Sequence, residues 1–361
     1  MNIHPAETWN ETIEAINKYA CVIKQQICPD NPFALGLRLS NLASVELAPL
    51  ALQFKEYLVR RDMYVATING FPYGQFHNGI IKENVYLPDW SQPERVTYTK
   101  RLARLLAILL PEGMVGSIST VPVCYGKKLP EGSLENIFET TEELSRIKAE
   151  TGKTIVLCLE PEPDCYLETT MDALRLWNVI RKLGKGSFLE FLGICLDTCH
   201  IACAFENPTN ALIKMKEADI QVPKIQISSI LRVSPRREYH TLFKPFLNSP
   251  YLHQTRVLSQ GTLLRFPDLE AALKENPMGE WRIHFHTPLY FEDWNGLETT
   301  SFDLNKSFFE ECCWAEKVLE IETYTFKSMP FKNIDVTESI CAEFNWILNG
   351  RSNFNVKQGE S

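Results

Sequence analysis

Residues 193–205, GICLDTCHIACAF, place three cysteines, one aspartate and one histidine within nine positions. Such a cluster could form a thiolate metal site, a redox centre, or the end of a buried strand whose Asp197 and His200 carry the chemistry. Cys195 and Cys199 share the alternation of Asp197, but their four-residue spacing lacks the CxxC pairs of structural zinc sites. We therefore interpret the thiols as packing residues and Asp197 and His200 as the reactive groups.

Four other apolar runs also carry polar side chains at their carboxyl ends. In each run the two polar residues are two positions apart, so in a strand both point to one face. An ionised group in an apolar strand is unfavourable by several kcal/mol unless it is paired or bound to a metal. The joint pattern therefore predicts a metal site built from these pairs: Glu160 and Glu162, Gln226 and Ser228, His284 and His286, and Glu320 and Glu322.

The segments that must position these groups alternate between short apolar runs and longer helical patterns. The runs are apolar on both faces, as expected for strands buried in a parallel sheet, and they occupy residues 33–40, 63–71, 114–123, 154–162, 191–198, 222–228, 280–287 and 318–326. Eight such units predict a single (β/α)8 TIM barrel, with its site at the carboxyl ends of the strands. A doubly wound sheet is the alternative, but RLSNLASVE after the first run lacks its glycine-rich turn.

One barrel domain is expected over residues 1–330, with an insertion at about 231–265 that reads as a long, functional loop. Residues 331–361 should form a closing amphipathic helix, at about 335–348, and a polar tail without fixed structure. Ser40 is a candidate N-cap of the first barrel helix, and Gly152 ends a helix that precedes the fourth run.

The composition narrows the class of protein. The 361 residues are 45% hydrophobic and 23% charged, with a net charge of −8, which argues against a non-specific grip on nucleic acid or anionic membrane. Eleven scattered cysteines are expected to be reduced, buried thiols. The absence of a basic leader and of a long apolar run predicts a cytoplasmic protein without membrane insertion. The sequence leaves the oligomeric state open.

The strand-end pattern resembles the xylose-isomerase-like TIM-barrel superfamily, which holds sugar isomerases, epimerases and apurinic nucleases of the endonuclease IV type. CLDTCH is especially similar to the metal motif of those nucleases. The resemblance implies a metal held by four strand-end ligands, Glu160, Asp197, Gln226 and Glu322. It also implies that His200 contacts the substrate or binds a second metal, with His284 or His286 as further ligands.

A carboxylate-rich site suits Mn²⁺, Mg²⁺ or Co²⁺, whereas nearby imidazoles favour Zn²⁺ or Fe²⁺. The ion would polarise a carbonyl or hydroxyl pair, and Glu160 and Glu322 would move a proton between adjacent carbons. The predicted function is therefore metal-dependent isomerisation or epimerisation of a small hydroxy-carbonyl compound.

LEPEP, GICLDTCH, HFHTP and LEIETYTF together are similar to the EboE family of metabolite traffic proteins, which implies the handling of a prenylated or pigment precursor. Two alternatives stay open: a phosphodiester hydrolase like endonuclease IV, and a non-catalytic carrier that keeps the metal site. The hydrolase would need histidines where this chain has Cys124 and Gln226.

Further candidate substrate contacts lie outside the strand-end ligand set: Asn69, His77, Trp90, Glu162 and His253. Asn69 could instead cap a turn, and Trp90 could simply pack. In the predicted loop, Arg236, Arg237, His240 and Lys244 form either a solvated face or a lid for an anionic substrate.

Overall fold

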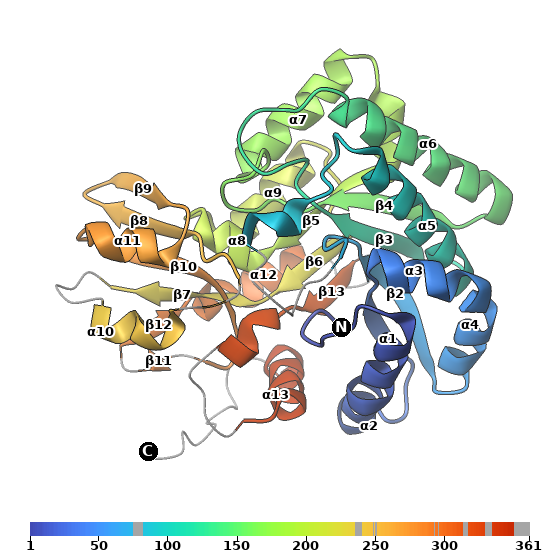
Figure 1. Cartoon of the computed structure of the whole chain (residues 1–361), viewed down its shortest axis with the longest axis horizontal. Coiled ribbons are helices and arrows are strands. Elements are labelled where there is room, and N and C mark those ends of the chain that lie inside the picture. The colour runs from blue at the N-terminus through green and yellow to red at the C-terminus, as the bar shows by residue number, and fades with distance from the viewer. Residues whose placement is uncertain are drawn as a thin grey trace.

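The computed structural model describes residues 1–74, 82–234, 240–247, 249, 251–291, 293–294, 296–312, 317–328 and 334–349. Figure 1 shows a curved parallel sheet flanked by helices, with a second sheet at one side of it. The main hydrophobic core fills the space between the parallel sheet and its helices. A separate core lies between the second sheet and the helices beside that sheet.

Seven strands form the parallel sheet, in the order β1-β2-β3-β4-β5-β6-β13. They are β1 Phe33–Arg38, β2 Met63–Asn69, β3 Val115–Thr120, β4 Thr154–Leu159, β5 Leu192–Asp197, β6 Lys224–Ile227 and β13 Val318–Ile321. The sheet curls nearly closed, so the predicted TIM-barrel class is confirmed. All of β5 is buried, as its continuous apolar run requires.

The connecting helices follow the predicted patterns. They are α3 Asn41–Leu47, α4 Ala51–Val59, α5 Pro93–Leu109, α6 Ser133–Thr151, α7 Thr170–Lys182, α8 Thr198–Cys203, α9 Pro208–Glu217 and α12 Lys306–Glu311. The predicted cap is confirmed, because the Ser40 side chain accepts a hydrogen bond from the backbone N–H of Ala43. Gly152 ends α6 in the left-handed region, at φ +72°.

Both ends of the chain also carry helices. α1 (Trp9–Ala15) and α2 (Cys21–Ile27) precede the barrel, and α13 (Val336–Asn349) confirms the predicted closing helix. Two 3₁₀ segments, η3 (Lys82–Tyr86) and η7 (Tyr324–Ser328), lie next to the site described below. The predicted polar tail lies outside the described residues.

Two predictions are wrong: the seventh strand does not join the barrel, and much of the predicted long loop is not a loop. Residues 280–287 do form a strand, β10 (Glu280–Thr287), but it pairs antiparallel with β7 (Ser229–Val233) and β8 (Thr255–Ser259). With β9 (Thr262–Phe266), β11 (Asp293–Trp294) and β12 (Leu297–Thr299) they make a second sheet, which also takes in much of the predicted loop; α10 (His240–Phe243) and α11 (Leu269–Glu275) accompany it. An apolar run shows that a strand is buried but not which strand it pairs with.

The second sheet still delivers its side chains to the barrel. Only Ser228 separates β6 from β7, so the second sheet begins where β6 ends. Because Thr287 pairs with Ser229, the carboxyl end of β10 lies beside the carboxyl end of β6. Histidines at the end of β10 therefore reach the same edge as the barrel residues.

Within the described part of the chain, β1 and β13 are the two edges of the parallel sheet. Residues 1–4 lie between them, where the Met1 ammonium group donates to the carbonyl oxygen of Gly36 at 2.9 Å. A Cβ atom at Gly36 would overlap the carboxyl group of Glu320, so a larger residue here would require the Glu320 side chain to move.

Glu343 is a buried carboxyl group that joins α13 to the barrel. It accepts hydrogen bonds from Oγ1 of Thr323 (2.9 Å) and the backbone N–H of Leu289 (3.3 Å). Burial raises the pKa of Glu343 to about 8, so the folded protein keeps a proton that the unfolded chain releases above its ordinary pKa. Stability is therefore lost as the pH rises from about 5 to 8.

Glu343→Gln removes the ionisable group; its amide oxygen can still accept from Leu289, and its amide nitrogen can donate to Oγ1 of Thr323. We expect it to stabilise the protein at pH 8 by at least about 1 kcal/mol, and to change the Tm little at pH 5. Calorimetry at both pH values measures this, with Glu338→Gln on the exposed side of α13 as the control. An equal gain at pH 5 and pH 8 would contradict the assignment.

Candidate active site

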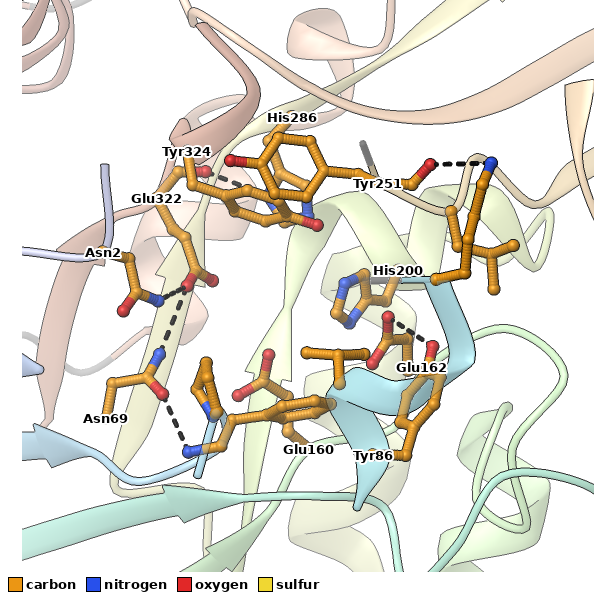
Figure 2. A pocket seen from close by; sticks show the side chains of 15 residues that line it. Asn2, Asn69, Tyr86, Glu160, Glu162, His200, Tyr251, His286, Glu322 and Tyr324 are labelled. Carbon is orange, nitrogen blue, oxygen red and sulfur yellow. Dashed lines mark hydrogen bonds between the residues drawn. The ribbon is translucent and has the colours of Figure 1, made fainter. Parts of the chain in front are cut away.

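The carboxyl ends of the barrel strands enclose a cavity with about 50 Å³ of free space. Figure 2 shows that Glu160, Glu162, His200 and Glu322 point into it; the first two follow β4, His200 belongs to α8 and Glu322 follows β13. An ion and a few water molecules fit in such a space. Other lining residues close its sides: Asn2, Asn69, Phe71, Pro72, Lys82, Val85, Tyr86, Tyr251, Leu252, His286 and Tyr324.

Three carboxylates form the centre of the site. Glu160 follows β4, Asp197 ends β5 and Glu322 follows β13, and one oxygen of each lies within 4.8 Å of the other two. The three residues are 4%, 1% and 5% exposed. One oxygen of each has no hydrogen-bond partner: Oε2 of Glu160, Oδ2 of Asp197 and Oε2 of Glu322. Buried, unsatisfied carboxylates are unfavourable, so this cluster has the donor set of a divalent cation site.

The electrostatics of the cluster agree with this reading. Burial, then repulsion by Glu322 and Asp197, raises the pKa of Glu160 well above its ordinary value. Burial raises the pKa of Asp197 to about 7, and burial followed by repulsion from Asp197 raises that of Glu322. A divalent cation would remove the repulsion that causes part of these shifts.

Neighbouring groups hold the three carboxylates in place. Oδ1 of Asp197 accepts from the backbone N–H groups of Cys199 (2.7 Å) and His200 (3.3 Å), which caps α8. Oε1 of Glu322 accepts from the side-chain amides of Asn69 (3.3 Å) and Asn2. Oδ1 of Asn69 also accepts from the backbone N–H of Phe71 at 3.0 Å, as the predicted turn cap would, while its contact with a substrate stays a prediction.

Three buried histidines lie beside the carboxylates, and a carbonyl oxygen fixes the Nδ1 atom of each. His200 Nδ1 lies 2.9 Å from the oxygen of Pro161, His284 Nδ1 lies 2.7 Å from Oε1 of Gln254, and His286 Nδ1 lies 2.9 Å from the oxygen of Glu322. A carbonyl only accepts, so each Nδ1 carries the proton and each neutral ring keeps a lone pair on Nε2.

The Nε2 atoms of His284 and His286 lie 3.0 Å apart. Burial lowers the pKa of both rings well below the ordinary value, so both are neutral and two lone pairs face one another. Three groups of three ligand atoms lie within 4.8 Å of one another here. They are Cys199, His284 and His286; Glu162, His200 and His284; and Asp197, His200 and His286. The imidazoles thus form a second cluster suited to a cation, with carbonyls supporting each ring.

A hydrogen-bonded chain connects the second sheet to Glu162. Gln254, just before β8, donates from Nε2 to the hydroxyl of Tyr86 (3.1 Å) and to the carbonyl of Pro163 (3.2 Å). Tyr86 in turn donates to Oε1 of Glu162 at 2.9 Å. Burial raises the pKa of Glu162 to about 7, although His200 and this hydrogen bond oppose the rise.

Lys224 supplies a buried positive charge inside the barrel. Its Nζ atom lies 2.5 Å from Oε2 of Glu320 and donates to Oγ of Ser119 at 3.1 Å. Burial alone would lower the pKa of Lys224, but Glu320 and the surrounding acidic groups raise it above its ordinary value. The ammonium group is therefore a fixed counter-charge next to the three carboxylates.

Three predicted site residues do not line the cavity themselves. Gln226, a predicted metal ligand, pairs in register with Asp197, which does not line the cavity either, and its Oε1 accepts from the Cys195 thiol at 3.2 Å. Trp90 lies in the main core, and the His253 ring stacks on Phe285. The roles of these three residues stay predictions.

The remaining candidates come from the loop after β2 and from the segment between β7 and β8. His77, Arg236 and Arg237 lie outside the described residues, as does the side chain of His240. Lys244 is exposed. The described cysteines are free thiols, most of them buried, in line with the packing interpretation.

Sequence reasoning missed several site residues, among them Tyr86, Gln254 as an anchor, Tyr324, Asn2 and Lys224. Two had a sequence signal: Lys224 shares the alternation of Gln226, and Tyr324 that of Glu322. The others come from segments without a strand pattern, so only the folded chain brings them to the site.

A family model for the xylose isomerase-like TIM barrel matches residues 29–295. The chain belongs to this family. The match covers β1 to β10, and thus every site residue except Asn2, Glu322 and Tyr324. None of the proteins with curated functions matches the sequence.

Several solved structures are similar to this chain at low identity. A xylose isomerase domain protein from Salmonella typhimurium is 12% identical over 90% of this chain and 95% of its own, with a TM-score of 0.44. D-allulose 3-epimerase from Methylomonas sp., in complex with D-allulose, is 12% identical over 63% and 69%, with a TM-score of 0.39. The IolI protein with a binding zinc atom is 15% identical over 59% and 72%, with a TM-score of 0.36.

This xylose isomerase-like chain contains, among the described residues, no helix with the length and apolarity needed to cross a membrane.

Proposed function

We propose that this protein binds a divalent metal at Glu160, Asp197 and Glu322, and isomerises or epimerises a small hydroxy-carbonyl compound. The observation that carries the proposal is the cluster of three buried carboxylates with unpartnered oxygens, of which Glu160 and Glu322 line the cavity. Membership of the xylose isomerase-like family supports it.

The residues present fit a metal. Glu160, Asp197 and Glu322 would hold it, and His200, His284 and His286 are the candidate ligands of a second ion. When bound, the ion would act as a Lewis acid on adjacent oxygens of the substrate. The mixed oxygen and nitrogen donors are compatible with Mn²⁺, Mg²⁺, Co²⁺, Zn²⁺ or Fe²⁺.

The chain's own residues then supply the proton transfer and the environment for it. Glu160 and Glu322 enter the cavity from different strand ends, so each can exchange a proton with an adjacent substrate carbon. Asn2 and Asn69 orient Glu322. Tyr86, Tyr251 and Tyr324 line the walls and limit the access of water.

Glu160→Gln and Glu322→Gln should each lower proton exchange by at least about 100-fold, because a positioned acid or base contributes about 10²–10⁴ to a rate. The measurement is deuterium uptake from D2O at the carbon next to the carbonyl, followed by NMR in a panel of ketoses with Mn²⁺. Exchange at the parental rate in both variants would exclude these two residues from the chemistry.

Cys195→Ser is the matched control, since this buried residue lies behind the cluster without lining the cavity. It should leave exchange within a few-fold of the parent. A protein that binds metal and ketose tightly but shows no exchange in any variant would be a carrier instead.

The role in metabolite traffic implied by the EboE resemblance stays a prediction. Nothing favours the hydrolase alternative: the Cys124 thiol donates to the carbonyl of Lys128 at 3.4 Å and does not line the cavity.

A further inference from the structure

A second, larger cavity lies between the two edges of the parallel sheet, and we call it the side chamber. It has about 480 Å³ of free space, between β1, β13, α13 and residues 1–4. Its walls are largely apolar and include Ala34 and Leu35 of β1, Ile321 of β13, and Ile340 and Phe344 of α13. The chamber exists because β1 and β13 do not pair in the described structure, so no strand fills the space between them.

The side chamber adjoins the candidate active site. Asn2 and Glu322 line both cavities, and the Asn2 side chain donates to Oε1 of Glu322 where the two meet. Figure 2 shows this contact at the edge of the active-site cavity. A molecule bound at the carboxylates could therefore extend into the chamber by displacing one side-chain contact.

The geometry points to an amphiphilic substrate, with a hydroxy-carbonyl head at the three carboxylates and a single aliphatic tail in the side chamber. This inference rests on the proposed function for the head alone. The tail follows from the apolar walls, because burying an alkyl chain there removes apolar surface from water.

The size of the chamber limits the tail. An apolar cavity of about 150 Å³ holds benzene, so 480 Å³ accommodates on the order of 15 carbons. Each methylene that enters should tighten binding about fourfold, until the chamber is full.

The test is calorimetric titration of the full chain, with Mn²⁺, with 1-hydroxy-2-alkanones of about 4 to 22 carbons and with 1-alkanols of the same lengths, a range that exceeds the capacity of the chamber. We expect both series to bind more tightly with length and then level off, with the hydroxy-ketones tighter at each length. If only the alcohols show this rise, the chamber stands and the proposed head chemistry fails. Affinity independent of length in both series overturns the inference.

Two variants change the chamber in opposite directions. Ala34→Phe should fill it and weaken the 10-carbon hydroxy-ketone at least about tenfold, while the 4-carbon compound is unaffected. Phe344→Ala should move the levelling-off to longer chains. Ala149→Phe on the exposed face of α6 is the control for Ala34→Phe, and the Tm and metal content of each variant verify folding and an intact site.

The chain's own segments are the competing occupants. If the 10-carbon compound binds only after residues 351–361 are removed, those residues fill the chamber and the inference is wrong. An unchanged affinity in Ala34→Phe would also overturn it.

Discussion

Replacement of Asp197 by asparagine is expected to lower the affinity for divalent metal by more than about 100-fold, and at the same time to stabilise the metal-free protein. The loss should exceed the 10–100-fold typical of removing a group that only supports a ligand. Elemental analysis of protein purified without added metal, followed by titration with Mn²⁺ and Zn²⁺, measures the first effect. Thermal unfolding after chelation measures the second.

The gain in stability follows from the protonation state of Asp197 in the metal-free protein. Burial raises its pKa to about 7, so the folded protein holds a proton that the unfolded chain releases above about pH 4. The metal-free protein should therefore lose stability as the pH rises from about 4 to 7. Asparagine removes this loss, and the gain, on the order of a few kcal/mol, should appear at pH 8 and vanish near pH 4.

Asp197→Ala separates charge from capping. Asparagine can keep the hydrogen bonds from the backbone of Cys199 and His200, whereas alanine loses them at about 1 kcal/mol. Both variants should lose the stabilisation that excess metal gives the parent. A parent protein without bound metal, or an asparagine variant that still binds it, would refute the metal site.

Replacement of Arg256 by leucine is expected to destabilise the protein by about 3 kcal/mol, because the buried carboxylate of Glu168 loses its guanidinium partner and keeps only the ion pair with Lys127. Arg256 of β8 is fully buried and donates to Oε1 of Glu168 (2.8 Å) and Oδ1 of Asp164 (2.7 Å). Both acids belong to the segment between β4 and α7 that also carries Glu162. The two ion pairs of Arg256 therefore connect the second sheet to the loop that carries Glu162.

Denaturant unfolding of two further variants tests this explanation. Arg256→Leu with Glu168→Leu should recover part of the loss, since the buried carboxylate is then removed together with its guanidinium partner. Arg232→Leu on β7 of the same sheet removes two ion pairs, to Glu280 and Glu298, that are partly exposed, so it should change stability by less than about 1 kcal/mol. Equal losses for Arg256→Leu and Arg232→Leu would show that burial of the pair is not the cause.

The sequence by itself determined the barrel and the centre of its site. Apolar runs identified every strand of the parallel sheet, and the carboxyl ends of parallel strands share one edge. Glu160, Asp197 and Glu322 could therefore be placed together from their positions at the ends of runs. The burial of the thiols around Asp197 was predictable from the same pattern.

Only the tertiary structure decided which strands pair and which groups complete the site. The apolar pattern of residues 280–287 suits a strand in either sheet, because it does not distinguish a parallel from an antiparallel neighbour. Contacts between segments far apart in the chain complete the site. They bring the His284 and His286 rings to the carboxylates, let Tyr86 donate to Glu162, and position Asn2 beside Glu322. The side chamber depends on two strand edges that stay apart, which no local sequence feature encodes.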